Sequence, residues 1–129
     1  VRLERLGSRT ACHIREPGVA ERARREGITR SAAAVDHAVP DLNGAIYAVG
    51  NAPTALLRLL RRVEEGTCSP ALIIGMPVGF VSAAESKELL TRQDRVPYIT
   101  VQGRKGGSPL AAAALNQLSL LALEAQGET

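Results

Sequence analysis

Short apolar runs alternate along the chain with longer stretches of helical periodicity. Runs such as "ALIIG" at residues 71–75 lack polar alternation. That pattern is typical of strands buried on both faces of a parallel sheet. The runs predict four strands, at residues 9–14, 44–50, 70–75 and 96–103. The stretches between and after them predict five helices, at residues 17–27, 29–39, 52–66, 82–93 and 108–125.

The helix expected at residues 52–66 has the clearest two-sided pattern. Its leucines and Val63 share one face, and the opposite face carries Arg58, Arg61, Arg62 and Glu65. We expect the apolar face to be buried and the charged face to lie in solvent.

Turn and capping residues mark several helix ends. Pro17 suits the first turn of a helix, and Gly27 suits the position just past its end. Thr29 or Ser31 can cap the next helix, which Pro40 stops.

Two later helices also begin at serines. Ser82 and Glu85 have capping-box spacing, and Ser108 is the expected cap of the last helix.

The alternation of strands and helices predicts the fold class. Strands joined through helices run parallel, with right-handed crossovers. The expected architecture is therefore an α/β three-layer sandwich with a parallel sheet. Because no linker, repeat or low-complexity segment interrupts the pattern, we expect residues 1–129 to form a single domain.

Composition narrows the possible functions. The aromatic share is 2% and Trp is absent, which argues against stacking on single-stranded nucleic acid. The net charge of +3 is compatible with small anionic ligands. The cysteines Cys12 and Cys68 form no disulfide framework, and no run reaches the roughly 18 apolar residues of a membrane span. We expect a cytoplasmic protein that binds neither nucleic acid nor membrane, and the start at Val1 suggests processing or a piece of something longer.

Three of the predicted strand ends share one design. Each of the strands predicted at residues 44–50, 70–75 and 96–103 ends in a glycine-containing turn that is followed by a helix of small residues. In an open parallel sheet, ligands bind outside the carboxyl ends of the strands, where helix N-termini offer free N–H groups. Each glycine could serve only tight packing. Three such turns together favour a platform for an anion, although none matches a dinucleotide or phosphate-loop motif.

At these turns the sequence resembles the precorrin-8X methylmutase family, also called precorrin isomerase or cobalt-precorrin-8 methylmutase. The similar strings are "GITRSAAA", "AIYAVGNAPTALLRLL", "PALIIGMPVGFVSAAESK" and "VPYITVQGRKGGSPLAAAALNQL". The resemblance covers nearly the whole chain and corresponds to the C-terminal two-thirds of family members.

The resemblance implies a flavodoxin-like sheet and a homodimer with its site near the subunit interface. It implies an isomerase of cobalamin biosynthesis that moves a methyl group from ring carbon 11 to ring carbon 12 of the corrin precursor, giving hydrogenobyrinate or its cobalt form. The substrate is a carboxylate-rich tetrapyrrole, and no cofactor is expected. The sequence does not distinguish a cobalt-bearing from a metal-free ring.

The resemblance also implies a general acid, a histidine in an N-terminal segment of family members that this sequence does not include. The catalytic residue is therefore left unassigned. We interpret His13 and His37 as structural or solvated, and neither cysteine as a nucleophile. No metal-ligand spacing is evident among the carboxylates.

Candidate substrate contacts combine the resemblance with the platform. Arg30 is the expected carboxylate-binding residue, with a plain surface arginine as the alternative. Thr29 and Ser31 could donate hydrogen bonds to the same carboxylate or only cap the helix. Asn51 could orient a ring substituent or close a turn. The remaining candidates lie in the other two turns: Gly75, Gly79, Phe80 and Arg104. Phe80 could instead anchor the core and Arg104 could lie at an interface. Glu85 and Lys87 could be a helical surface pair or site residues of the family, and we favour the surface pair.

Two further functions stay open. One is a truncated flavodoxin-like module that binds a tetrapyrrole or another anion without catalysis. The other is an anion- or nucleotide-binding α/β protein unrelated to corrins.

Overall fold

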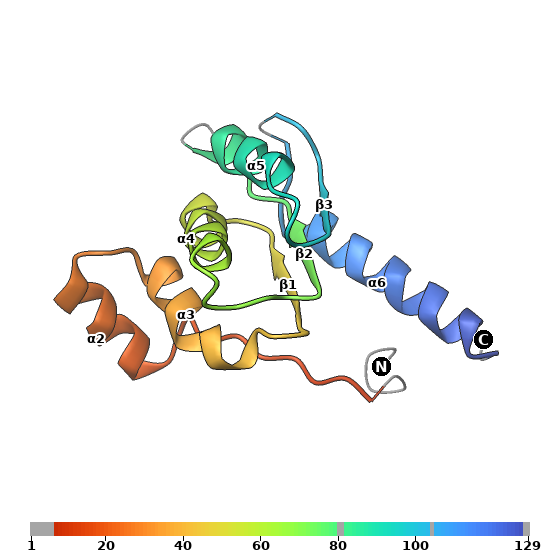
Figure 1. Cartoon of the computed structure of the whole chain (residues 1–129), viewed down its shortest axis with the longest axis horizontal. Helices are drawn as coiled ribbons and strands as arrows, with labels where there is room; N and C mark the ends of the chain where they lie inside the picture. The colour runs from red at the N-terminus through yellow and green to blue at the C-terminus, as the bar shows by residue number, and fades with distance from the viewer. Residues whose placement is uncertain (1–6, 80–81, 104, 128–129) are drawn as a thin grey trace.

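The computed structural model describes residues 7–79, 82–103 and 105–127. Phe80 and Arg104, two of the predicted substrate contacts, lie outside these residues. Figure 1 shows the succession of elements along the chain. The helices are α2 (Pro17–Glu26), α3 (Arg30–Ala38), the 3₁₀ turn η1 (Val39–Asp41), α4 (Pro53–Glu64), α5 (Ala83–Arg92) and α6 (Ser108–Ala125). The strands are β1 (Ile46–Val49), β2 (Leu72–Gly75) and β3 (Tyr98–Thr100).

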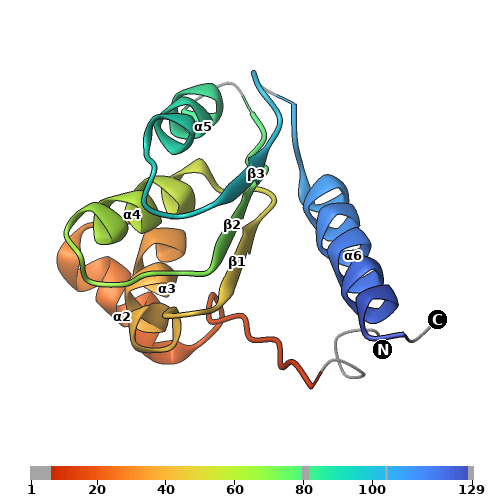
Figure 2. The ribbon, with the colours of Figure 1, turned by 45° about the vertical axis from the view of Figure 1, so that its right-hand side comes forward.

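The three strands form one parallel sheet in the order β1-β2-β3. Val49 pairs with Gly75, and Gly75 pairs with Thr100, so the carboxyl ends of the strands are level. Figure 2 shows α2 to α5 on one face of the sheet and α6 alone on the other. The predicted α/β class with a parallel sheet in three layers is confirmed. A flavodoxin-like sheet has a further strand on the other side of its first strand. The three observed strands do not test that expectation.

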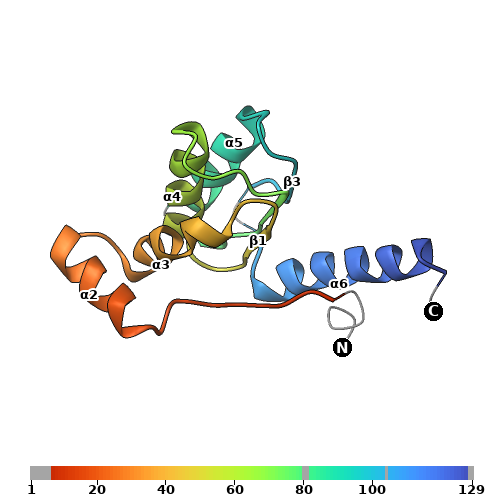
Figure 3. The same cartoon turned by 60° about the horizontal axis from the view of Figure 1, so that its bottom comes forward.

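The prediction of a strand at residues 9–14 is wrong. These residues are irregular, and residues 8–12 make no backbone hydrogen bond to another described residue. A β-branched or apolar run becomes a strand only when a neighbouring strand satisfies its backbone groups. Figure 3 shows this segment passing apart from the strands before it enters α2. It ends in a turn in which Glu16 N donates to His13 O at 3.1 Å.

Two apolar clusters hold the layers together. Ile73 faces the layer formed by α2 to α5 and packs with Leu56, Leu59 and Leu90, all fully buried. The next residue, Ile74, faces the other way and packs with Ala111 of α6. Because consecutive side chains of a strand point to opposite faces, the continuous run at β2 supplies both clusters.

Several helix ends follow the sequence prediction. Pro17 opens α2, and Gly27 ends it in the left-handed conformation with φ 68°. The hydroxyl of Thr29 caps α3 by accepting from Ala32 N at 3.0 Å. Pro40 lies in the 3₁₀ turn that follows α3.

The predicted capping roles of the two serines are wrong. Ser82 precedes α5 in a left-handed conformation, with φ 65° and no side-chain hydrogen bond to the helix, so the capping box with Glu85 does not form. Ser108 is already the first helical residue of α6, and its predecessor Gly107 makes no side-chain cap. A capping box needs an extended backbone at the N-cap, which Ser82 lacks.

The charged face predicted for α4 is only partly in solvent. Arg61 is exposed, but Arg58 and Arg62 donate to the carboxylate of Asp36 in α3, at 2.6 Å and 2.8 Å for the shortest contacts. The Asp36 side chain is only 6% exposed. This ion-paired group joins α3 to α4.

Candidate functional site

The loops after the three strands lie against one another at the carboxyl edge of the sheet. Gly107 N donates to Met76 O at 2.8 Å, which ties the loop before α6 to the loop after β2. Val78 N and Asn51 O are 3.5 Å apart, at the limit of a hydrogen bond, between the loops after β2 and β1. The three loops therefore lie side by side at one edge of the sheet, as the predicted platform requires, while anion binding there stays a prediction.

Close packing explains two of the glycines in these loops. A Cβ on Gly50 would lie 2.5 Å from the Cα of Ser108, and one on Gly106 would lie 2.5 Å from the carbonyl oxygens of Met76 and Pro77. Only glycine permits such approaches of backbone to backbone. At these positions the packing interpretation of the glycines is sufficient.

Gly75 likewise has a packing role. It is buried, and an added Cβ would lie 2.6 Å from Leu90 Cδ2. Gly79 and Gly103 differ, because no described atom lies within 4 Å of their Cβ positions and their φ angles are 130° and 82°. The geometry therefore supports ligand approach at Gly79 and does not support a ligand contact at Gly75.

The helices that leave the platform begin without side-chain caps. The N-cap residues of α4, α5 and α6 are Ala52, Ser82 and Gly107, and none makes a side-chain hydrogen bond to its helix. No side chain therefore takes up the remaining free N–H groups of these first turns, which the helix dipole makes attractive to anions. They are fewest in α4, because Pro53 has no N–H and Ala55 N already donates to Ala52 O at 3.1 Å.

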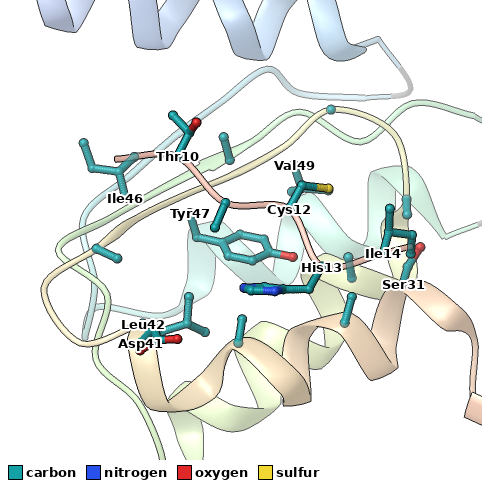
Figure 4. A pocket seen from close by; sticks show the side chains of 18 of the residues that line it. Thr10, Cys12, His13, Ile14, Ser31, Asp41, Leu42, Ile46, Tyr47 and Val49 are labelled. Carbon is teal, nitrogen blue, oxygen red and sulfur yellow. The ribbon is translucent and has the colours of Figure 1, made fainter. Parts of the chain in front are cut away.

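A cavity of about 990 Å³ adjoins the platform on the side of β1. Its walls are residues 9–14, β1 and one side of α3, and its lining extends to Ser31, Asn51 and Ser108. Figure 4 shows the side chains of Tyr47 and His13 pointing into the space between β1 and α3. Burial, with a smaller effect of Cys12, raises the pKa of Tyr47 to about 12, so its hydroxyl stays protonated at neutral pH. The volume is at the upper end of small-molecule sites.

The structure brings some of the predicted site residues together. Ser31 and Asn51 line the same cavity, from α3 and from the loop after β1. Thr29 and Arg30 are exposed just before Ser31, and Thr29 Oγ1 donates to Thr54 Oγ1 at 3.1 Å, which joins the starts of α3 and α4.

Lys87 was predicted to lie on the surface, and this prediction is wrong. Its side chain is buried, with 2% exposure, and its ammonium donates to the backbone carbonyl of Lys105 beneath the loop before α6. Burial lowers the pKa of Lys87. The spacing of Ala83, Lys87 and Leu90 on one helical face was a sequence signal for this position. Glu85 is exposed, as expected.

Sequence reasoning also missed how His13, Glu16 and His37 come together. Glu16 Oε1 lies 2.7 Å from His13 Nδ1, and Glu16 Oε2 lies 2.6 Å from His37 Nε2. Hydrogen bonding to His13 is the main cause of the lowered pKa of Glu16. The H-x-x-E spacing at residues 13–16 was present in the sequence, but the approach of His37 depends on the packing of α3.

A parallel α/β sheet with glycine turns and uncapped helix N-termini at its carboxyl edge is the arrangement typical of ligand-binding α/β proteins. A model of the family described as precorrin-8X methylmutase matches residues 1–121. The chain belongs to this family.

Individual proteins agree with the family match. The chain is 50% identical to a cobalt-precorrin-8 methylmutase of Priestia megaterium over 121 residues, covering 94% of this chain and 53% of that protein. It is 50% identical to a precorrin-8X methylmutase of Pseudomonas aeruginosa over 113 residues, covering 87% of this chain and 54% of that protein.

The solved structure of a precorrin-8X methylmutase from Thermus thermophilus has a similar fold. It superimposes with a TM-score of 0.82 at 44% identity, covering 98% of this chain and 59% of that one. The chain thus spans about half the length of the curated relatives it matches, less than the two thirds expected from the resemblance.

Proposed function

We propose that this chain binds a carboxylate-rich tetrapyrrole at the carboxyl edge of its sheet and forms part of a precorrin-8X methylmutase. The observation that carries the proposal is the family match over residues 1–121. The activity proposed is the isomerisation that moves a methyl group within the corrin precursor. The relatives named above include both precorrin-8X and cobalt-precorrin-8 methylmutases, so the metal content of the ring stays open.

The geometry of the carboxyl edge supports this choice of ligand. A large flat anion needs accessible backbone and dispersed positive charge rather than one deep pocket. Gly79 and the uncapped starts of α4 and α5 offer accessible backbone next to the cavity beside β1. The helix N-termini supply part of the positive charge.

Four polar residues on this side are the proposed contacts. Arg30 binds a substrate carboxylate, and it forms no ion pair with another described residue. Ser31 and Asn51 hydrogen-bond to ring substituents from the cavity lining, and Thr29 assists at the start of α3 while also capping it. Phe80 and Arg104 stay predicted contacts.

Binding is tested by titrating the chain with hydrogenobyrinic acid and following the visible spectrum of the corrinoid. We expect saturable binding at micromolar concentrations or below. Arg30→Ala should weaken it by about tenfold or more, because it removes a charge-assisted hydrogen bond. The matched control is Arg24→Ala, which removes an exposed arginine from the last turn of α2 and should leave the affinity unchanged. Equal affinities of the two variants, or no spectral change, would contradict the proposal.

The alternative of a binding module without catalysis is separated by turnover. Purified protein is incubated with precorrin-8X, and the appearance of the hydrogenobyrinate spectrum is followed. Binding with turnover supports the isomerase. Binding without turnover, in a preparation shown to be saturated with ligand, supports the module instead.

We also propose a homodimer and a cytoplasmic location. The exposure of Leu110 and Leu121 on α6, at 41% and 50%, supports an apolar contact on that helix. Sedimentation of the wild-type chain and of a Leu121→Glu variant tests the homodimer, because a monomer in both would contradict it.

The free thiols of Cys12 and Cys68 are compatible with the cytoplasm. None of the helices in the described residues has the length and apolar character to cross a bilayer.

A further inference from the structure

The side chains of His13, Glu16 and His37 converge from two separate parts of the chain. His13 and Glu16 belong to the turn that leads into α2, and His37 belongs to the last turn of α3. One potential ligand atom from each lies within 4.8 Å of the other two. The imidazole rings are 5.0 Å apart between centroids and are tilted by 55°, so they are not stacked face to face.

This set of donors has the chemistry of a transition-metal site. Two imidazole nitrogens and one carboxylate oxygen are ligands that zinc-like divalent cations prefer, whereas Mg²⁺ and Ca²⁺ favour sites made of oxygen. Zinc bonds to such atoms are about 2.0–2.2 Å long, which puts tetrahedral neighbours about 3.3 Å apart. The carboxylate–imidazole distances of 2.7 Å and 2.6 Å need to widen by less than about 1 Å for a cation to enter.

Exposure and charge also suit a cation. The side chains of His13, Glu16 and His37 are 21%, 43% and 41% exposed, which leaves a path for entry and room for water at a fourth position. The carboxylate of a partly exposed glutamate such as Glu16 is ionised at neutral pH. Metal ligation requires that ionised form.

We propose that His13, Glu16 and His37 form a binding site for a zinc-like divalent cation that fastens the segment before α2 to the end of α3. His13 also lines the cavity beside β1, so the cation fixes one wall of that cavity. Residues 8–12 make no backbone hydrogen bond to another described residue, and a cation at their end gives this segment an anchor. This inference goes beyond the proposed isomerase and needs no corrinoid.

The test is isothermal titration calorimetry of the metal-free chain with zinc chloride. We expect one site per chain with micromolar affinity. Glu16→Gln and His37→Gln should each weaken it by about tenfold or more, because each removes one of three ligands. The matched control is Glu21→Gln, which changes an exposed carboxylate on α2 and should bind zinc like the wild type.

Cys12 is the nearest competing explanation, because it is an exposed thiol adjacent to His13 in the chain. Cys12→Ser should therefore keep the affinity. Loss of zinc binding in Cys12→Ser, equal binding by Glu16→Gln and the wild type, or no binding at all would overturn the proposal. In that case the three residues form only a hydrogen-bonded bridge.

A second measurement guards against a misfolded variant. The visible absorption of Co²⁺ bound to nitrogen and oxygen ligands should appear with the wild type and with Glu21→Gln, and should be lost with His37→Gln. Far-ultraviolet circular dichroism of the same samples checks that His37→Gln is folded, and Glu16→Gln provides the same comparison if it is not. Because corrinoid is absent from these experiments, their failure leaves the proposed function untouched.

Discussion

The ion-paired group that joins α3 to α4 predicts a specific dependence of stability on pH. Burial of the Asp36 carboxyl would by itself raise its pKa. Hydrogen bonds from Arg58 and Arg62, together with their charges, outweigh that effect and lower the pKa from 3.8 to about 2. The folded chain therefore binds a proton at Asp36 less readily than the unfolded chain does.

The size of the effect follows from linkage. A shift of one pKa unit corresponds to about 1.4 kcal/mol, so the lowering from 3.8 to about 2 makes folding more favourable by about 2 kcal/mol at neutral pH. Because the folded pKa is depressed, this stability is present above the unfolded pKa. It is lost as the pH falls from about 4 to about 2.

Asp36→Asn is the perturbation that isolates this contribution. It keeps the size of the side chain but leaves Arg58 and Arg62 without their carboxylate. We expect a loss of about 2–3 kcal/mol in the free energy of unfolding at neutral pH, at the low end for a broken buried pair, because the arginine side chains are 17% and 27% exposed.

Urea unfolding of the wild type and the variant, followed by circular dichroism at several pH values, measures the difference. The gap between the two should shrink by about 2 kcal/mol as the pH is lowered to about 2. Asp94→Asn, at an exposed carboxylate, should show no such gap at any pH. A gap for Asp36→Asn that does not change with pH would refute the reasoning.

Two further substitutions test the loops at the carboxyl edge of the sheet and the buried Lys87 beneath them. Gly50→Ala should lower the free energy of unfolding by more than about 2 kcal/mol and weaken corrinoid binding, because the new Cβ would lie 2.5 Å from the backbone of Ser108. The control Gly18→Ala, where nothing lies within 4 Å of the added Cβ, should be neutral or slightly stabilising in the same urea unfolding assay. Lys87→Met should change the stability at neutral pH by less than about 1 kcal/mol, since the lost hydrogen bond to Lys105 is offset by removal of a buried charge. Since the pKa of Lys87 is lowered, the wild type should gain stability relative to Lys87→Met as the pH rises toward 10.5, and a difference independent of pH would contradict this.

The sequence alone was enough to place most of the helices and strands. The apolar runs of β1, β2 and β3 and the periodic stretches of the five helices gave elements within a few residues of those observed. Gly27 and Thr29 ended and began helices as expected, because a left-handed residue and a capping hydroxyl act on their immediate neighbours. The family resemblance also rested on sequence alone, and the family match confirmed it.

Only part of the candidate site could be predicted from the sequence. Ser31 and Asn51 were selected from the sequence and line one cavity. Gly75 was selected for the same reasons but packs on Leu90, because a glycine at a strand end serves packing and ligand approach equally well until its neighbours are known.

Other features depended on the tertiary structure. The residues around His13 had a strand-like pattern, but they lie across a cavity from the edge strand β1 and do not pair with it. Lys87 became buried because the loop around Lys105 folds over it. The meeting of Asp36 with two arginines of α4, and of Glu16 with two histidines, joins side chains from different elements. Periodicity and turn chemistry are local and can be read along the chain, whereas these contacts exist only because packing of the helices on the sheet places distant residues together.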